Sequence, residues 1–378
     1  MDGIKKILTI NYGSTSTKLA YFHNDQVVAR FEESIGADVI DKCRQVLQQL
    51  PFRRQSVIDF IKNNNINVAE LDMIVSRGGT IHGLHTGPYE VDEHLLAVHK
   101  YAPRAQMPSL LAAIVGAEIA EPYGIPVIIY DAPSGDDADE IMHITGIKGL
   151  RRRVTTHALN GKFVAHAVAD EIGKPYEECN FIVAHLGGGI TIGFHHNGRI
   201  IDSVMDDAGP ISPQRAGRAP IDGLVDMCFS GKYTKQEVMF AARGGGGIVA
   251  LLGTQDTREV EKRIADGDEY ARQVYEYVAY TVAKGIAELS VADFGKIDAI
   301  ILTGGIAKSK MFTEMVSKRV EFLAPVKIIP GEQEMLALAR GGLRVLSGQE
   351  TPQKYTWWPE GINNIDEFMA AYAGNETK

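Results

Sequence analysis

The sequence predicts a protein of two α/β domains built on one plan, because three features recur in the same order in its two halves. Each half opens with an antiparallel hairpin that is interrupted by a turn of small residues. A strand that runs into two glycines follows, and then a short strand that is entered through a proline. The paired segments are residues 7–22 and 180–203, 73–79 and 299–305, and 125–131 and 324–330.

The small-residue turns of the two hairpins favour an anion as the ligand. In the second half Gly187, Gly188 and Gly189 interrupt two strands, and such a run weakens a sheet unless something approaches the backbone closely. Backbone N–H groups without a neighbouring Cβ cradle phosphate oxygens. An ordinary glycine-rich hairpin is the alternative, and the recurrence of the turn at Gly13 argues against it. We expect both turns to face one cleft between the domains and to hold a phosphate chain there.

Length, charge and cysteine usage bound the class of protein. The 378 residues suffice for two domains of ordinary size. A formal net charge of −9 argues against general binding to nucleic acid or to anionic membranes. Three lone cysteines, Cys43, Cys179 and Cys228, are typical of a reducing compartment. No targeting segment and no membrane-spanning apolar run is visible, so we expect a cytoplasmic protein.

Four polar residues are candidates for a functional site. Asp131 ends the strand that is entered through a proline, and carboxylates at such strand ends point into clefts, although a cap of the following turn is the alternative. His157 precedes a predicted helix and would donate to a phosphate. Arg215 and Arg218 lie in the Gly- and Pro-rich loop 206–220, where we expect one of them to contact an anion and the other to be structural.

Helical sequence occupies most of the remaining chain, and we interpret it as packing. A stripe of apolar residues over 270–289 indicates core, and acids at the start of the last long helix are favoured by its dipole. We interpret His82 and His85 as residues of a solvated loop, and a metal site is the alternative. The helical segments are residues 37–65, broken near Pro51, and residues 107–120, 158–172, 270–289 and 335–346.

These motifs resemble the acetate and sugar kinase, Hsp70 and actin superfamily, and within it the short-chain acyl kinases, most closely the butyrate kinases. The resemblance covers essentially the whole chain, except that residues 103–109 and 132–139 depart from the pattern beside the expected acyl pocket. The matching motifs are residues 11–18 (Asn-Tyr-Gly-Ser-Thr-Ser-Thr-Lys), 185–189 (His-Leu-Gly-Gly-Gly), 157–160, 212–217, 228–232, 302–305 and 330–334.

The resemblance implies two duplicated actin-like, ribonuclease H-like domains that face a central cleft. Residues 1–150 would form the N-terminal domain, and residues 352–378 would dock back on it. Residues 151–351 would form the C-terminal, nucleotide-binding domain. We also expect a homodimer or a higher homo-oligomer.

The resemblance further implies a magnesium site and a nucleotide site. Asn11 and Glu334 would help bind Mg²⁺, with Glu332 as the alternative to Glu334. Lys18 would lie on the phosphates of ATP or ADP. The full set of nucleotide-binding residues is Gly13, Ser14, Thr15, Lys18, His185, Gly187, Gly188, Gly189, Asp256, Thr257, Arg258, Gly304 and Gly305.

The predicted reaction is ATP-dependent phosphorylation of a short-chain carboxylate such as butyrate, run in cells toward ATP from butyryl phosphate. The resemblance places Asp131 at the catalytic centre and implies that His157 and Arg215 stabilise the phosphoryl group during its transfer. We expect Arg77 to bind the carboxylate. A propionate, branched-chain or acetate kinase is the alternative. A non-catalytic, nucleotide-dependent regulator on the same fold is a further one, because one fold hosts many functions; the four residues Asp131, His157, Arg215 and Glu334 together count against it.

Overall fold

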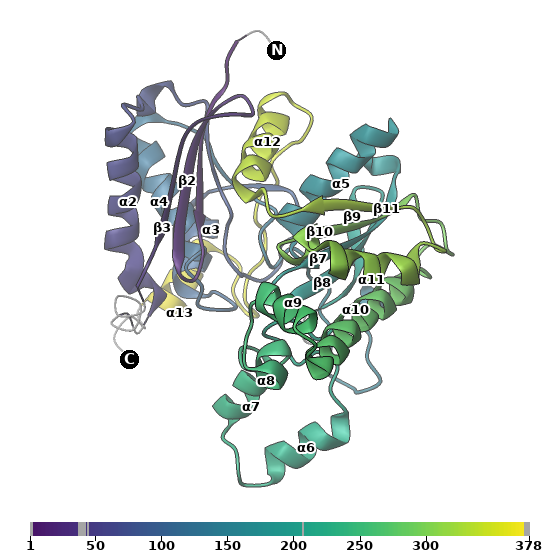
Figure 1. Cartoon of the computed structure of the whole chain (residues 1–378). Coiled ribbons are helices and arrows are strands. Elements are labelled where there is room, and N and C mark those ends of the chain that lie inside the picture. The colour runs from purple at the N-terminus through teal and green to yellow at the C-terminus, as the bar shows by residue number, and fades with distance from the viewer. Residues whose placement is uncertain (1–2, 37–42, 44, 206–207, 374–378) are drawn as a thin grey trace. The chain divides into compact units, whose positions relative to one another are not determined.

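The structure is a computed structural model that describes residues 3–36, 43, 45–205 and 208–373 (Figure 1). It divides into two compact units, Met1–Asp136 with Gln333–Lys378 and Asp137–Glu332. Residues 137–150 thus belong with the second unit and residues 333–351 with the first, which differs from the domain limits expected from the sequence. Positions 37–42, 44, 206, 207 and 374–378, which fall in three predicted segments, lie outside the described residues.

A six-stranded sheet in the order β3-β2-β1-β4-β6-β5 forms the centre of the first unit. The first three strands make an antiparallel meander, and the next two continue parallel to β1. A short strand pairs antiparallel to β6 at the edge. The strands are β1 (Lys6–Tyr12), β2 (Ser16–His23), β3 (Gln26–Ser34), β4 (Met73–Ser76), β5 (Pro88–Glu90) and β6 (Val127–Tyr130).

The sheet of the second unit repeats this plan in the order β9-β8-β7-β10-β11. It has the same antiparallel meander followed by two parallel strands. Even the register shift recurs between the second and third strands, at Tyr21/Phe22 in the first unit and at Phe194/His195 in the second. The duplicated α/β plan is therefore confirmed. The strands are β7 (Asn180–Leu186), β8 (Ile190–His196), β9 (Arg199–Val204), β10 (Ala299–Gly304) and β11 (Val326–Pro330).

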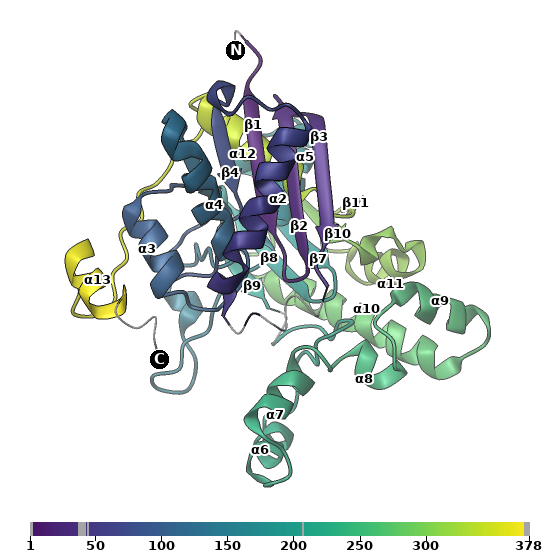
Figure 2. The same ribbon diagram turned by 90° about the vertical axis from the view of Figure 1, so that its left-hand side faces the viewer.

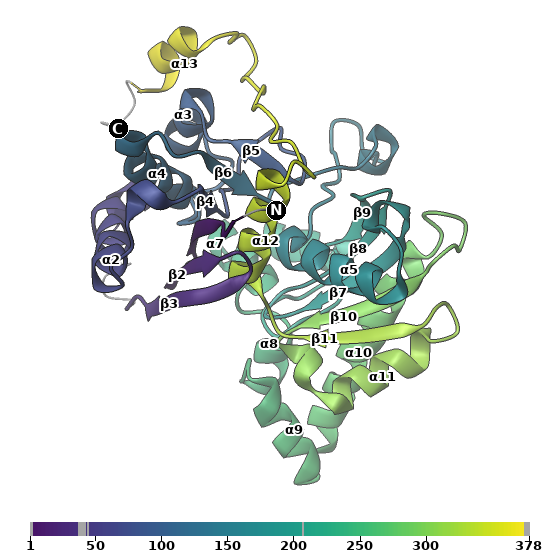
Figure 3. The same ribbon diagram turned by 90° about the horizontal axis from the view of Figure 1, so that it is seen from above.

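Helices cover both faces of the first sheet. Figure 2 shows α2 and α4 over one face, and Figure 3 shows α12 on the other. Alternation along the strands explains this arrangement, because Leu8 and Ile10 pack toward α4 whereas Ile7 and Val75 lie against Gly342 of α12. The helices are α2 (Leu50–Asn63), α3 (Glu93–Tyr101), α4 (Leu110–Ala120), α12 (Glu334–Leu346) and α13 (Ile365–Tyr372).

Two details of the first unit differ from or extend the prediction. Pro51 lies in the first turn of α2 and begins that helix rather than breaking it, since a proline there lacks only an N–H that needs no partner. The tail after α12 packs on this unit, where the Tyr355 hydroxyl donates to the His82 carbonyl over 2.7 Å. The His82 ring also stacks on Trp357, with ring centroids 5.0 Å apart, so packing accounts for this histidine.

The second sheet is covered in the same two-sided way. The predicted apolar stripe over 270–289 is core, because Val278, Val282 and Ile286 of α10 are completely buried against the sheet. On the other face Val164 and Ala165 of α5 pack against Phe181. The helices are α5 (Ala158–Ile172), α6 (Ile221–Phe229), α7 (Lys235–Ala242), α8 (Ile248–Leu252), α9 (Thr257–Ala265), α10 (Glu269–Leu289) and α11 (Lys310–Val320).

Short 3₁₀ helices complete the connections, and none of the helices described could cross a membrane, because none is both long and apolar enough. The 3₁₀ helices are Val46–Gln49, Val68–Glu70, Glu121–Tyr123, Glu140–His143, Tyr176–Glu178 and Ile306–Lys308.

Candidate active site

The turn between β1 and β2 contains two backbone N–H groups without an acceptor in the described part of the chain. It is closed by the N–H of Gly13, which donates to the carbonyl of Ser16 over 2.9 Å. A Cβ at position 13 would lie 2.7 Å from the Ser16 hydroxyl, so a larger residue there would require the Ser16 side chain to turn away. Ser14 and Thr15 are exposed, and their N–H groups donate to no acceptor among the described residues. Two neighbouring backbone N–H groups without an acceptor suit an anion.

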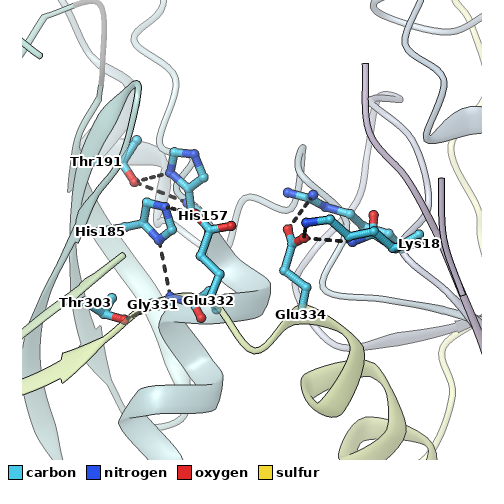
Figure 4. A network of polar contacts seen from close by, with 11 residues as sticks. Lys18, His157, His185, Thr191, Thr303, Gly331, Glu332 and Glu334 are labelled. Atoms are coloured by element: carbon cyan, nitrogen blue, oxygen red, sulfur yellow. Dashed lines mark hydrogen bonds and ion pairs between the residues drawn. The ribbon is translucent and has the colours of Figure 1, made fainter. Parts of the chain in front are cut away.

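Glu334 is the first residue of α12 and accepts hydrogen bonds from three side chains of the first unit, among them Lys18 (Figure 4). Its Oε2 accepts from Asn11 Nδ2 over 2.8 Å and from Lys18 Nζ over 3.4 Å. Asn11 and Lys18 lie opposite each other in the β1–β2 register. The other oxygen, Oε1, accepts from Arg77 Nη1 over 2.7 Å. We call these four residues the Glu334 cluster.

The Glu334 cluster has donors that fit a hard divalent cation. The Oδ1 atom of Asn11 is buried and lacks a hydrogen-bond partner in the described chain, although its Nδ2 reaches the carboxylate of Glu334. An amide oxygen beside a carboxylate is the kind of donor set that Mg²⁺ takes when phosphate and water supply the remaining ligands. The described residues contain no group of three or more His, Cys, Asp or Glu that could hold a metal by themselves.

Asp131 follows β6 in an unusual backbone conformation. Its φ is +44°, a region that few residues other than glycine adopt, and its side chain is only 2% exposed. The carboxylate Oδ1 accepts from the N–H of Gly87 over 2.8 Å. Asp131 is therefore held by the loop that carries Gly87. Strain of this kind concentrates at functional sites.

Two stacked histidines form the centre of a polar network in the second unit, with Glu332 beside them (Figure 4). The rings of His157 and His185 are 4.0 Å apart and nearly parallel. His185 Nδ1 lies 3.3 Å from Asn160 Nδ2, a donor, so the proton of this histidine is on Nε2 and faces Glu332 Oε1 at 3.1 Å. His157 Nδ1 lies 2.8 Å from the hydroxyl of Thr191. We call these five residues the His185 cluster.

A pocket of about 350 Å³ in the second unit brings together predicted nucleotide residues from three segments. The carbonyl of Gly188 beside it accepts from the hydroxyl of Ser212 over 2.7 Å and from the N–H of Gln214 over 3.1 Å. Gly304 precedes the pocket with a φ of +90°, and a Cβ there would lie 2.5 Å from a backbone oxygen. The lining residues are Gly187, Gly188, Pro213, Gln214, Gln255, Asp256, Thr257, Gly305 and Ile306.

The arginines near this pocket differ in their surroundings. The side chain of Arg258 is 89% exposed and pairs with Asp256 over 2.6 Å, which holds the pKa of that carboxyl at about 2. Arg215 Nη1 donates to the carbonyl of Gln214 over 3.2 Å. Arg218 pairs with Glu288 over 2.8 Å on the surface.

Sequence reasoning missed several partners of the predicted residues. Asn160, Thr191 and Thr303 hold the histidines or their neighbours, and Gln214 and Gln255 line the pocket. Asn160, Thr303 and Gln214 lie inside the matching motifs 157–160, 302–305 and 212–217, which is the signal that could have found them, whereas Thr191 and Gln255 lie outside every motif. What they contact depends on pairing across the sheet, which a motif does not specify.

A duplicated sheet with a small-residue turn in each unit, a carboxylate–lysine–arginine cluster and a glycine-lined pocket define an actin-like phosphotransferase. The acetokinase family model matches residues 143–356. Butyrate kinase 2 of Clostridium acetobutylicum is 41% identical over 352 residues, which cover 93% of this chain and 99% of that relative. The chain therefore belongs to the acetokinase family, whose members are carboxylate kinases.

Solved structures share this fold at lower sequence identity. The acetate kinase of Porphyromonas gingivalis has a TM-score of 0.74 at 17% identity and covers 90% of this chain and 100% of its own. A propionate kinase from Francisella tularensis has a TM-score of 0.70 at 19% identity, with 89% and 98% covered. These likenesses extend the duplicated fold over nearly the whole chain.

Proposed function

We propose that this carboxylate kinase acts on butyrate or a close homologue and that it runs in the cytoplasm toward ATP, from butyryl phosphate and ADP. The observation that carries the proposal is the 41% identity to a butyrate kinase across 93% of the chain. We further propose a homodimer or a higher homo-oligomer, which sedimentation velocity over a range of concentrations would test.

The chemistry needs little help from a general base. A carboxylic acid is already ionised at neutral pH, so its oxygen is ready to attack. In the direction of acyl phosphate formation, a carboxylate oxygen forms a bond to the γ-phosphorus while the bond to the β,γ-bridging oxygen breaks and ADP leaves. Catalysis of such a transfer is positioning and neutralisation of charge.

In the first unit we assign the Glu334 cluster to the metal and the phosphates. Mg²⁺ would neutralise phosphate charge when bound, held by Asn11 and Glu334, and the orphaned Asn11 oxygen supports this assignment. Lys18 and the N–H groups of the 13–15 turn would contact phosphate oxygens. We assign Arg77 to the carboxylate of the substrate.

Asp131 would hold a water or the reacting groups in position rather than accept a proton from substrate, because the substrate carboxylate has none to give at neutral pH. Its buried carboxylate and strained backbone support a role that folding alone does not explain.

In the second unit we assign His157 of the His185 cluster and Arg215 to the phosphoryl group that is transferred. A Thr191 hydroxyl that donates to Nδ1 of His157 would leave Nε2 of this histidine protonated, and thus a donor to a phosphoryl oxygen. The adenine nucleotide would occupy the glycine-lined pocket, and the meeting there of residues from three segments supports this. The assigned residues are His185, Gly187, Gly188, Gly189, Asp256, Thr257, Arg258, Gly304 and Gly305.

The experiment is a hydroxamate assay with straight and branched acids of two to six carbons. Each methylene that the pocket encloses should contribute about 0.8 kcal/mol, or roughly fourfold in kcat/KM, up to the best chain length. We expect the maximum at butyrate. A maximum at acetate, at propionate or at a branched acid would replace butyrate as the substrate, and no transfer to any acid would reject the proposal.

A further inference from the structure

Arg53 is a completely buried arginine in the first unit to which the reaction assigns no role. It lies in the first turns of α2, and no carboxylate pairs with it in the described part of the chain. Its neighbour Arg54 is partly exposed and makes an ordinary ion pair with Glu118 over 2.7 Å. Burying a guanidinium costs free energy because the group loses its bound water, so hydrogen bonds from the protein have to offset that cost.

The partners of Arg53 are the inward-facing oxygens of the 13–17 turn. Nη2 donates to the carbonyl of Gly13 over 3.0 Å, and Nη1 donates to the carbonyl of Ser16 over 3.0 Å and toward the hydroxyl of Thr17 at 3.4 Å. Nε donates to Gln49 Oε1, four residues earlier, over 3.0 Å. The planar fork of an arginine can hold two backbone oxygens at once, which a lysine cannot match.

This grip orients the peptide groups of the turn. The carbonyls of Gly13 and Ser16 point at the guanidinium, and the carbonyl of Thr15 accepts from the N–H of Ile35 over 2.8 Å. Ser14 and Thr15 are exposed, and their N–H groups donate to no acceptor among the described residues. The carbonyls of Gly13, Thr15 and Ser16 are thus engaged within the protein, whereas two N–H groups of the turn are left for a ligand.

The charge on Arg53 acts in the same direction. Burial lowers its pKa to about 10, so the guanidinium still carries its proton at neutral pH. The hydroxyl of Tyr12 donates to the Arg53 carbonyl over 3.0 Å and its ring lies 5.0 Å from the guanidinium, which fixes the group behind the turn. A fixed positive charge in a poorly screened position favours an anion at the turn.

We propose that Arg53 is a positioning residue for the nucleotide phosphates: it holds the 13–17 turn with two of its N–H groups left for a ligand and places a buried positive charge near them. This inference rests on the proposed assignment of that turn to the phosphate chain. It deepens that assignment, because it explains how two backbone N–H groups are kept ready for an anion.

The test separates phosphate binding from general folding. Arg53→Met, Arg53→Lys and the control Arg54→Met would be compared with the unchanged enzyme by calorimetric titration with Mg·ADP and with adenosine, after thermal unfolding has shown each variant to be folded. We expect Arg53→Met to weaken ADP binding by on the order of 10²-fold. Adenosine binding should change by less than about twofold, Arg53→Lys should recover part of the loss, and Arg54→Met should match the unchanged enzyme.

An equal loss of ADP and adenosine binding in folded Arg53→Met would overturn the proposal, and so would unchanged ADP binding. If Arg53→Met does not fold, the same titrations are made with Gln49→Leu. This variant keeps the guanidinium but removes the acceptor that orients Nε. We expect it to weaken ADP binding roughly three- to tenfold and to leave adenosine binding unchanged. Unchanged ADP binding in both Gln49→Leu and Arg53→Lys would reject the role.

Titration also keeps this inference apart from the proposed reaction. An enzyme that binds Mg·ADP but phosphorylates no carboxylate would refute the reaction, while the Arg53 comparison would still be decided. Conversely, a butyrate kinase whose Arg53 variants bind ADP normally would retain its function and refute the role of Arg53.

Discussion

The two small-residue turns occupy the same place in the two sheets but are held by different chemistry. The first turn is held from behind by a buried cation, Arg53, which takes two of its carbonyls. The second is held by neutral groups, because the hydroxyl of Ser212 and the N–H of Gln214 both donate to Gly188. Duplication therefore kept the strand order and the bulge, whereas each turn acquired its support from sequence outside the repeat.

The two supports differ in how closely they are linked to the proposed reacting groups. The support of the first turn comes from a helix that carries none of the proposed reacting groups. The support of the second turn comes from the loop 212–215, which also carries Arg215 and is closed by a hydrogen bond from the N–H of Ser212 to the carbonyl of Arg215 over 3.1 Å. A change in that loop should thus affect nucleotide binding and the chemical step together.

The largest expected effect concerns Arg215. Arg215→Ala should lower kcat by on the order of 10²–10⁴ with little change in KM, because a planar charged donor is most useful to the charge that develops in the transition state. Arg215→Lys should restore part of the rate. Steady-state kinetics would measure both variants. Arg218→Ala is the control, because Arg218 forms an exposed ion pair on the surface.

A rise in KM for the carboxylate at unchanged kcat would contradict this prediction. Arg215 would then be a substrate anchor, and Arg77 would become the candidate for the transition state.

The next effect distinguishes the two carboxylates near the unit boundary. Glu334→Gln should lower kcat/KM by on the order of 10²–10³, because Glu334 accepts hydrogen bonds from Asn11, Lys18 and Arg77. The same variant should raise the Mg²⁺ concentration needed for half-maximal activity. Glu332→Gln should cost about tenfold or less, since Glu332 faces His185. Magnesium titrations of both variants provide the measurement. A larger magnesium effect in Glu332→Gln would move the metal ligand to that residue.

Acid should destabilise each unit through one buried histidine. Burial lowers the pKa of His99 to about 4 and that of His195 to about 3, from an ordinary value of 6.5. The unfolded chain then binds more protons below pH 6.5, so stability is complete above that pH and falls as the pH drops toward 4. The loss is about 3 kcal/mol for each group.

Urea unfolding between pH 7.5 and 4.5 would measure this loss, with tryptophan fluorescence reporting the first unit, where Trp357 and Trp358 both lie. His99→Gln should flatten the pH dependence of that signal. An unchanged slope would show that His99 does not set it.

The smallest effect concerns the neutral support of the second turn. Ser212→Ala removes one donor to Gly188 but leaves the N–H of Gln214 in place, so it should cost about 1 kcal/mol, or roughly fivefold in affinity for ADP. Calorimetric titration measures this beside Arg53→Met. If Ser212→Ala weakened ADP binding as strongly as Arg53→Met, the contrast between a charged and a neutral support would be wrong.

Local signals predicted the repeated strands and the glycine turns, because side-chain alternation and turn residues act over a few positions. They missed the unit boundary, since Gly341 and Gly342 of α12 admit Tyr130 and Val75, partners two hundred or more residues away in sequence. They also missed Arg53.

The sequence contains one weak indication that Arg53 makes a specific contact. Arg53 falls on the buried face of α2 with Val57 and Phe60, where an apolar residue is expected. A polar residue in an apolar stripe can mark a buried contact, yet nothing in α2 names the turn that it contacts. The roles proposed for the site residues likewise rest on chemistry that only kinetics can test.

The backbone of Asp131 has a consequence for how this position would respond to selection. Its positive φ costs free energy that glycine would avoid, and asparagine tolerates this region as aspartate does, keeps the Oδ1 acceptor for Gly87 and buries no charge. A library randomised at position 131 and sorted for heat resistance alone should drift toward glycine and asparagine. The same library sorted for kinase activity should return aspartate. The residue found at position 131 would therefore show whether a lineage was selected for stability or for catalysis.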